Sequence, residues 1–172
     1  MRRGLVKGFS RELLKAIQSN SLEVSTSYGV LRDADIVLVA VNTPTKPDGS
    51  QDLSQVLSAL NGLAEVWKSV WFDYRVIVLK STILPGSTRA LARYARDELG
   101  LPIPDRVGFA YSPEFLRADK ALEDVLKPSR VVVGGIDERS STSVATFFRE
   151  FYNRKPRPSG RGGGQIIKKI RK

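Results

Sequence analysis

The sequence predicts an α/β protein in which helices flank a mostly parallel sheet. Two observations carry this prediction. Short segments that are continuously apolar and rich in β-branched residues recur along the chain, as strands buried on both faces of a sheet do. Between them lie longer segments whose apolar residues recur at helical spacing. Strands and helices that alternate in this way form parallel sheets with right-handed crossovers.

Four segments are predicted as buried strands, and each ends at polar or turn-forming residues: 36–41, 76–79, 107–111 and 131–133. The first, Ile36 to Val41, is the longest uninterrupted apolar run, far shorter than the roughly 20 residues of a membrane helix. Residues 22–26 alternate apolar and polar side chains, which predicts a short strand exposed on one face.

The predicted helices are recognised from apolar residues three or four positions apart. They cover the second half of 5–17, with Ser10 as a candidate cap, and residues 53–64, 87–99, 118–126 and 140–152. Asp52 is a candidate cap for the second helix, with Gln55 completing a box-like pair. The fourth helix is expected to stop at Lys127 and Pro128, because the residue before a proline is disfavoured in helical conformation.

Composition excludes several classes of chemistry. The 172 residues, 41% hydrophobic and 27% charged, are typical of a globular domain. There is no cysteine and no histidine, which excludes thiol nucleophiles, Ser-His-Asp triads, disulfides and His/Cys zinc sites. No apolar stretch resembles a secretory signal or a membrane span, so we expect a cytoplasmic protein that does not enter a membrane.

The net charge of +10 suggests an acidic partner until the charges are located. Eight cations and no anion lie from Arg154 to Lys172, so the first 153 residues carry only +2. We therefore expect a domain over residues 1–152 and a disordered, basic, Gly/Arg-rich tail over residues 153–172. The sequence also allows a short basic helix over residues 165–172, too short to be stable alone.

Polar segments follow three of the predicted strands, at residues 42–49, 80–86 and 112–117. In open parallel sheets, ligands bind beyond the carboxyl ends of the strands. Hydroxyls and free backbone N–H groups at such an edge suit a ligand that carries phosphate. The alternative is that these segments are only turns, since Pro, Gly, Asn and Thr are common turn formers. Spacing alone leaves both interpretations open.

Taken together and in this order, the three segments resemble the NAD-binding domain of the UDP-glucose/GDP-mannose dehydrogenase family. The resemblance extends from about Phe9 to Tyr152. Its specific stretches are residues 34–36 through 52–54, 80–82 through 85–86, 112–117, 120–124 and 127–130. It implies a Rossmann-like fold and an NAD-dependent oxidoreductase that oxidises the hydroxymethyl group of a nucleotide sugar, such as UDP-glucose, to a carboxylate with two NAD molecules.

The resemblance also implies roles for individual residues. The cofactor pyrophosphate and ribose would be lined by Val41, Asn42, Thr43, Pro44 and Thr45, and the nicotinamide side by Ser81, Thr82 and Ile83. The nucleotide sugar would be bordered by Glu114, Phe115, Leu116 and Arg117. Thr82 and Glu114 would hold and activate the water of the second oxidation step. Two alternatives stay open: Glu114 as a carboxylate at a helix N-terminus, and Lys80 as an ordinary salt-bridge partner, which we favour.

The sequence departs from the family pattern in three places. The Gly-x-Gly-x-x-Gly turn and the acidic ribose ligand of the family do not occur, so the expected sheet lacks the first βαβ unit. The catalytic cysteine does not occur either, and without it the family's thiohemiacetal route is impossible. Ala118 stands where the family usually has a glutamate. We therefore expect a fragment that is inactive alone, from a gene that is truncated or whose reading frame is disrupted.

Two further expectations concern partners. An unpaired apolar sheet edge predicts a homo-oligomer or a complementing chain. A different class of function, a non-enzymatic basic protein that binds nucleic acid through its Arg/Gly tail, stays as an alternative. Only Phe151 and Tyr152 lie near the tail for base stacking, so we expect nucleic acid not to be the partner.

Overall fold

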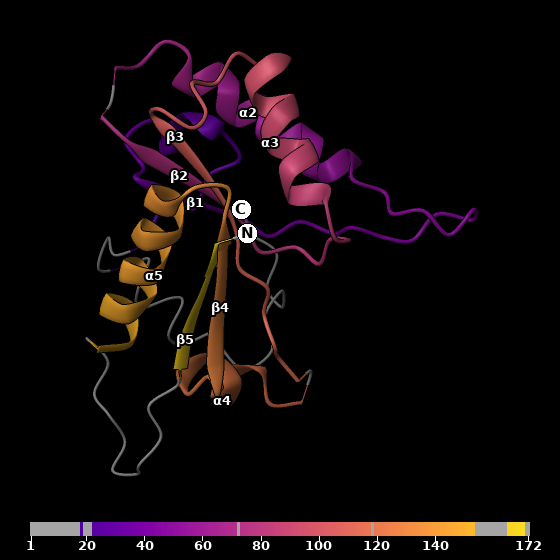
Figure 1. The fold of residues 1–172 in the computed structure, drawn as a ribbon, viewed down its shortest axis with the longest axis vertical. Coiled ribbons are helices and arrows are strands. Elements are labelled where there is room, and N and C mark those ends of the chain that lie inside the picture. The colour runs from indigo at the N-terminus through magenta and orange to yellow at the C-terminus, as the bar shows by residue number, and fades with distance from the viewer. Residues whose placement is uncertain (1–17, 19–21, 72, 118, 154–164, 171–172) are drawn as a thin grey trace.

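The computed structural model describes residues 18, 22–71, 73–117, 119–153 and 165–170. Figure 1 shows its elements in order: η1 (Tyr28–Leu31), β1 (Ile36–Val39), α2 (Ser54–Trp67), β2 (Arg75–Leu79), α3 (Ser87–Asp97), β3 (Val107–Tyr111), α4 (Ala121–Leu126), β4 (Arg130–Gly135), α5 (Glu138–Asn153) and β5 (Gln165–Ile170). Among the described residues, no helix is long and apolar enough to cross a membrane.

The strands form one sheet in the order β1-β2-β3-β4-β5. β1, β2 and β3 run parallel, which the apolar runs of β1 and β2 predict. β4 is antiparallel to β3 and pairs with it only at the end of β3, where Ala110 faces Gly135 and Tyr111 faces Gly134. β5 lies parallel to β4 at the far edge. The predicted Rossmann-like, mostly parallel sheet with flanking helices is confirmed.

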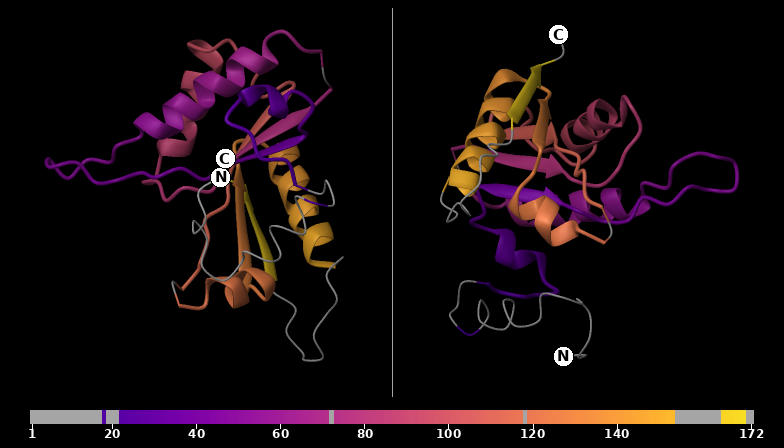
Figure 2. Two further views of the ribbon diagram at one scale, coloured as in Figure 1. Left: turned by 180° about the vertical axis from the view of Figure 1, so that it is seen from behind. Right: turned by 90° about the horizontal axis from the view of Figure 1, so that it is seen from below.

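Helices cover the two faces of the sheet, as the right-hand view in Figure 2 shows. On one face, α2 and α3 pack on side chains that include Val39, Ile77 and Phe109. On the other face, α5 packs on side chains that include Val76 and Val78. All five residues of β2 are buried, because β2 has a strand on each side and helices on both faces.

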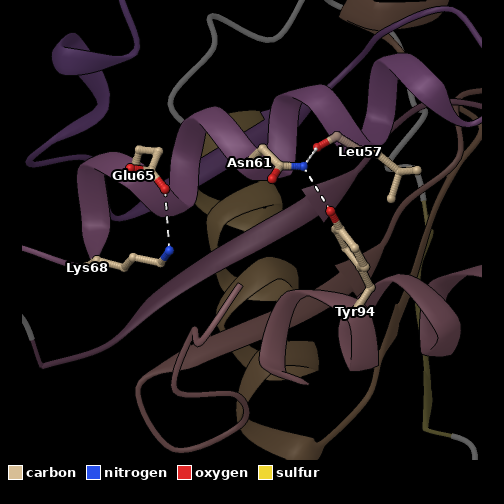
Figure 3. Close-up of polar contacts among 5 residues, drawn as sticks. All are labelled: Leu57, Asn61, Glu65, Lys68 and Tyr94. Carbon is tan, nitrogen blue, oxygen red and sulfur yellow. Dashed lines mark hydrogen bonds and ion pairs between the residues drawn. The ribbon is translucent and has the colours of Figure 1, made fainter. Parts of the chain in front are cut away.

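A polar contact links α2 to α3 within the first helical layer (Figure 3). Asn61 donates from Nδ2 to the Leu57 carbonyl oxygen at 2.7 Å and to the Tyr94 hydroxyl at 3.0 Å. Close by along α2, Lys68 forms an exposed ion pair with Glu65 at 3.3 Å. The α2–α3 contact sets the position of α2, whose first residues follow the polar loop that leaves β1.

Several local predictions were wrong. Residues 22–26 form no strand; the η1 turn follows them instead, with the Ser27 hydroxyl accepting from the Gly29 N–H. Helix α4 begins at Ala121 rather than at 118. The predicted Asp52–Gln55 capping pair does not form: Asp52 accepts only from the Ser54 N–H, and Leu53 occupies the cap position.

The tail also differs from prediction at the residues that the structure describes. Residues 165–170 form strand β5 beside β4, not a basic helix, because a β ladder supplies backbone hydrogen bonds that a short isolated helix lacks. Residues 154–164 and 171–172, and all of the helix predicted within 5–17, lie outside the described residues. The division into a domain and a tail stays a prediction.

β1 is an edge strand, since β2 is its partner and no other described strand pairs with it. Leu38, in the middle of β1, is 44% exposed, whereas its neighbours Val37 and Val39 are buried against the α2 and α3 layer. The apolar side of β1 therefore remains partly open on one face of the sheet.

Candidate functional site

The three polar segments singled out in the sequence begin side by side at the carboxyl edge of the parallel strands. In the register of the sheet, Val39 at the end of β1 faces Leu79 at the end of β2, and Leu79 faces Tyr111 at the end of β3. The segments that follow these residues are thus neighbours, as expected for ligand-binding loops of an open α/β sheet.

Ser81 joins the first two segments. Its side chain is only 7% exposed, and its hydroxyl accepts from the Val41 N–H at 2.9 Å while donating to the Val41 carbonyl oxygen at 2.6 Å. The N–H groups of Lys80 and Ser81 both donate to the Val39 carbonyl oxygen, at 2.8 and 3.2 Å. These bonds continue the β1–β2 pairing past the ends of the strands and fix where the 42–52 loop begins.

The loop between β1 and α2 extends away from the sheet as a hairpin, visible as the purple arm in Figure 1. Thr45 and Gln51 form an antiparallel bridge, and the Asp52 N–H donates to the Pro44 carbonyl oxygen at 2.8 Å. At its tip, the Asp48 carboxylate accepts from the Ser50 N–H and hydroxyl at 2.9 and 2.6 Å. These bonds lower the pKa of Asp48 and give the exposed loop a defined shape.

Side chains of this hairpin also bind the segment after β2. The Thr82 carbonyl oxygen accepts two hydrogen bonds, from the Thr43 hydroxyl at 2.6 Å and from Gln51 Nε2 at 2.7 Å. The Oε1 atom of Gln51 accepts from the Leu84 N–H at 3.1 Å. The loops after β1 and β2 are therefore one hydrogen-bonded unit.

The predicted cofactor-side residues differ in exposure within this unit. Ser81 and Ile83 are buried at 7% and 8%, and Ile83 packs in the core beneath α2 and α3. The exposed members are Asn42, Pro44, Thr45 and Thr82, with Val41 and Thr43 half-buried. The side chains of Ser81 and Ile83 thus stabilise the edge, and the groups offered to a ligand come from the others.

A second part of the edge is a cavity of about 550 Å³ on the α5 side, between α4, β4, α5 and the segment after β3. All four predicted substrate-side residues line it: Glu114, Phe115, Leu116 and Arg117. Other lining residues are Leu38 of β1, Lys80 after β2, and the aromatic side chains of α5, Phe147, Phe148, Phe151 and Tyr152. Thr82 does not line this cavity, so the structure brings Glu114 together with Lys80 rather than with Thr82.

Lys80 is half-buried in this cavity, with Nζ 5.6 Å from the ring centroid of Phe148. Burial lowers its pKa, and the nearby Glu114 carboxylate partly offsets that effect. The ion pairs of the described residues do not include Lys80. The salt bridge that we favoured for Lys80 is therefore not found among the described residues, where Glu114 is the charged group that influences it.

Both the side chain and the backbone of Arg117 form hydrogen bonds with Asp124. Its guanidinium bonds the Asp124 carboxylate at 2.6 and 3.1 Å, and its backbone N–H donates to the same carboxylate at 2.8 Å. These bonds lower the pKa of Asp124 to about 2. The guanidinium of Arg130 lies 4.9 Å from the ring centroid of Phe115. Both contacts hold the segment after β3 against α4 and β4, which shapes the cavity wall.

Sequence reasoning missed Gln51 and the cavity role of Lys80. Gln51 sits inside a loop pattern and carries no signal beyond its type, so only the fold shows what it reaches. Lys80 directly follows a buried strand on the edge that bears the site, and that position was an available signal. The Ser112 hydroxyl, fully buried after β3 without a hydrogen-bond partner, was also not singled out. No metal-ligating cluster occurs in the part of the chain that the structure describes.

Known proteins show the same architecture. A GDP-mannose dehydrogenase from Pseudomonas aeruginosa superimposes with a TM-score of 0.82 over 98% of this chain and 36% of its own, at 23% identity, which supports the fold. A UDP-glucose dehydrogenase from the archaeon Pyrobaculum islandicum gives 0.74 at 32% identity, over 94% of this chain and 35% of its own. The fold and the loop-bearing edge thus define a dinucleotide-binding type of α/β domain.

Sequence comparison gives the family. Residues 6–152 match the model of the UDP-glucose/GDP-mannose dehydrogenase family, NAD binding domain, and the chain belongs to this family. It is 33% identical to the UDP-glucose 6-dehydrogenase YwqF of Bacillus subtilis over 88% of its length, and 30% identical to the UDP-glucose 6-dehydrogenase AglM of Haloferax volcanii over 86%. The chain spans about a third of the length of each relative, 34% in both cases.

Proposed function

We propose that this chain supplies the cofactor-facing and sugar-facing loops of an NAD-dependent nucleotide-sugar dehydrogenase of the UDP-glucose 6-dehydrogenase type. The observation that carries the proposal is the bonded unit of the loops after β1 and β2, adjacent to a cavity lined by the segment after β3. Three loops that the family resemblance assigns to one site are neighbours at one edge of one sheet.

The described residues fit one side of a dinucleotide site. Exposed backbone and hydroxyl groups of Asn42, Thr45 and Thr82 lie at the edge where parallel sheets bind such ligands. The loops that present them are held by the Ser81 and Gln51 bonds. The glycine turn that approaches a pyrophosphate closely does not occur in the sequence, so we propose that these loops hold the nicotinamide and ribose side. When bound, NAD accepts the hydride of the substrate alcohol.

The cavity suits the sugar nucleotide. Its apolar and aromatic walls offer contact area, and Lys80 and Glu114, two of the charged residues that line it, lie close enough for the Glu114 carboxylate to influence Lys80. We assign Glu114 to accepting a proton from the water of the second oxidation, and Thr82, which does not line the cavity, to the cofactor side of the edge. Both side chains are exposed and follow adjacent strands at one edge. Lys80 lines the same cavity as Glu114.

Complete turnover needs one more group. The 172 residues contain no cysteine, so the chain has no thiolate to add to the aldehyde intermediate. We therefore propose that this chain binds its ligands but does not by itself convert the hydroxymethyl group to a carboxylate. In this proposal a complementing chain supplies that thiolate.

Calorimetry on the full 172-residue chain tests the proposal. We expect saturable binding of NAD and, separately, of UDP-glucose. Glu114→Gln should weaken UDP-glucose binding and leave NAD binding unchanged. The matched control is Glu65→Gln, an exposed residue on the outer side of α2. Absence of saturable binding of both ligands would refute the proposal, as would equal weakening of both by Glu114→Gln.

A further inference from the structure

The carboxamide of Gln51 makes both of its hydrogen bonds to the backbone of the neighbouring loop. Nε2 donates to the Thr82 carbonyl oxygen at 2.7 Å, and Oε1 accepts from the Leu84 N–H at 3.1 Å. One planar side chain thus spans the backbone on both sides of residue 83. A bidentate contact of this kind fixes orientation as well as distance, because both bonds must be satisfied at once.

The segment it holds carries Thr82, which is exposed and bears a hydroxyl group. Ser81 before it and Ile83 after it are buried, so their side chains anchor the segment on the inner side. The Thr82 carbonyl is held from the hairpin by Gln51 and Thr43 together. With the backbone held on both sides, the exposed side chain of Thr82 starts from a fixed point at the edge.

We propose that Gln51 is a positioning residue, which locks residues 82–84 to the loop after β1 and so sets the direction of Thr82 at the cofactor edge. The inference rests on the proposed function for the part that concerns NAD. It adds a residue to which neither composition nor the family resemblance gives a role. It also assigns a role to the hairpin, which carries Gln51 at its base and holds it there through the Thr45–Gln51 bridge.

The chemistry of the clamp distinguishes glutamine from its near isosteres. Alanine removes both bonds. Glutamate keeps an acceptor for the Leu84 N–H but sets a carboxylate oxygen against the Thr82 carbonyl oxygen. Protonation of that carboxyl group, below about pH 4, restores a donor. Gln51→Glu should therefore behave as a pH-dependent clamp, which a residue that only fills space would not do.

The primary readout is amide hydrogen exchange, which needs no ligand. In Gln51→Ala, the Leu84 amide should exchange about two- to tenfold faster, the range expected when one ordinary hydrogen bond is lost. Thr43→Val removes the other donor to the Thr82 carbonyl and should leave the Leu84 amide unchanged. The matched control is Gln55→Ala, since Gln55 is an exposed glutamine one helical turn away on α2.

The second readout is NAD affinity. Gln51→Ala should weaken NAD binding about two- to tenfold while the melting temperature stays close to that of Gln55→Ala. Gln51→Glu should weaken it at neutral pH and recover on acidification relative to Gln55→Glu, which carries the same charge change. An unchanged Leu84 exchange rate in Gln51→Ala overturns the clamp. Faster exchange with unchanged NAD affinity overturns its positioning role.

Failure of the proposed function has a separate signature. If the wild-type chain shows no saturable NAD binding, the proposed function fails, and the clamp is then judged on Leu84 amide exchange in Gln51→Ala and on the pH dependence of that exchange in Gln51→Glu relative to Gln55→Glu. Those two measurements still support or overturn the bond between the loops.

Discussion

Removal of one buried hydroxyl should weaken the edge of the sheet on which the site is built. In Ser81→Ala, the Val41 N–H and carbonyl lose their partners, which lie 2.9 and 2.6 Å from Ser81 Oγ. A net hydrogen bond contributes about 1 kcal/mol, so two bonds give a loss of about 2 kcal/mol. A buried polar group left without a partner costs up to about 3 kcal/mol. Val41 is only half-buried, so water can replace part of the lost bonding, and about 3 kcal/mol is an upper limit for the loss of stability.

The assay is urea unfolding followed by far-ultraviolet circular dichroism, with the melting temperature as a second measure. We expect the free energy of unfolding to fall by about 2 kcal/mol with an unchanged m-value, and the melting temperature to fall by about 4–8 °C. The control is Ser58→Ala, an exposed serine of α2, expected within about 0.5 kcal/mol of wild type. If Ser81→Ala matches this control, the account of Ser81 as the bond between the two loops is wrong.

Three further predictions concern the charge network, the core and the sheet edge. The pKa of Asp124, measured by carboxyl-carbon NMR, should be about 2 and should return toward 3.8 in Arg117→Gln. Because the pKa of Asp124 is depressed in the folded protein, the stability it contributes is present above about pH 4 and is lost as the pH falls toward 2. A wild-type titration midpoint near 3.8 would contradict the pairing of Asp124 with Arg117. Leu60→Ala, at a fully buried position of α2, should lower the free energy of unfolding by about 3 kcal/mol in urea; a loss under about 1 kcal/mol would contradict the packing. Leu38→Lys on the edge strand β1 should reduce concentration-dependent self-association, measured by light scattering. If the wild-type protein is a monomer at all concentrations, the edge strand does not mediate self-association.

The apolar segments were enough to predict most of the fold. Residues 76–79 and 107–111 form β2 and β3 as expected, because a continuous apolar run between turn formers has few other uses than a buried strand. The antiparallel direction of β4 and the strand β5 were not predictable in this way. The direction of a strand depends on its connection, and β5 pairs only because β4 offers it a free edge.

The site was predictable to the extent that position along a strand determines it. The segments after β1, β2 and β3 were located correctly as neighbours. The role of each side chain was not predictable, because burial depends on the layer that packs against it. Ile83 packs into the core, and the Ser81 hydroxyl donates a hydrogen bond to the Val41 carbonyl oxygen. Long polar side chains are the hardest to assign, because they interact with residues far away in sequence. Lys80 lies near Glu114, 34 positions away, and Gln51 bonds to Thr82, 31 positions away.

The central claim is that the loops after β1 and β2 form the cofactor edge of a nucleotide-sugar dehydrogenase domain. The most direct test is a titration of NAD into the uniformly labelled 172-residue chain, followed by amide chemical shifts. The account predicts saturable shifts that cluster at residues 41–45 and 81–84 and spare the far ends of the strands. Saturable shifts confined to other parts of the chain, or no saturable shift at all, would contradict it.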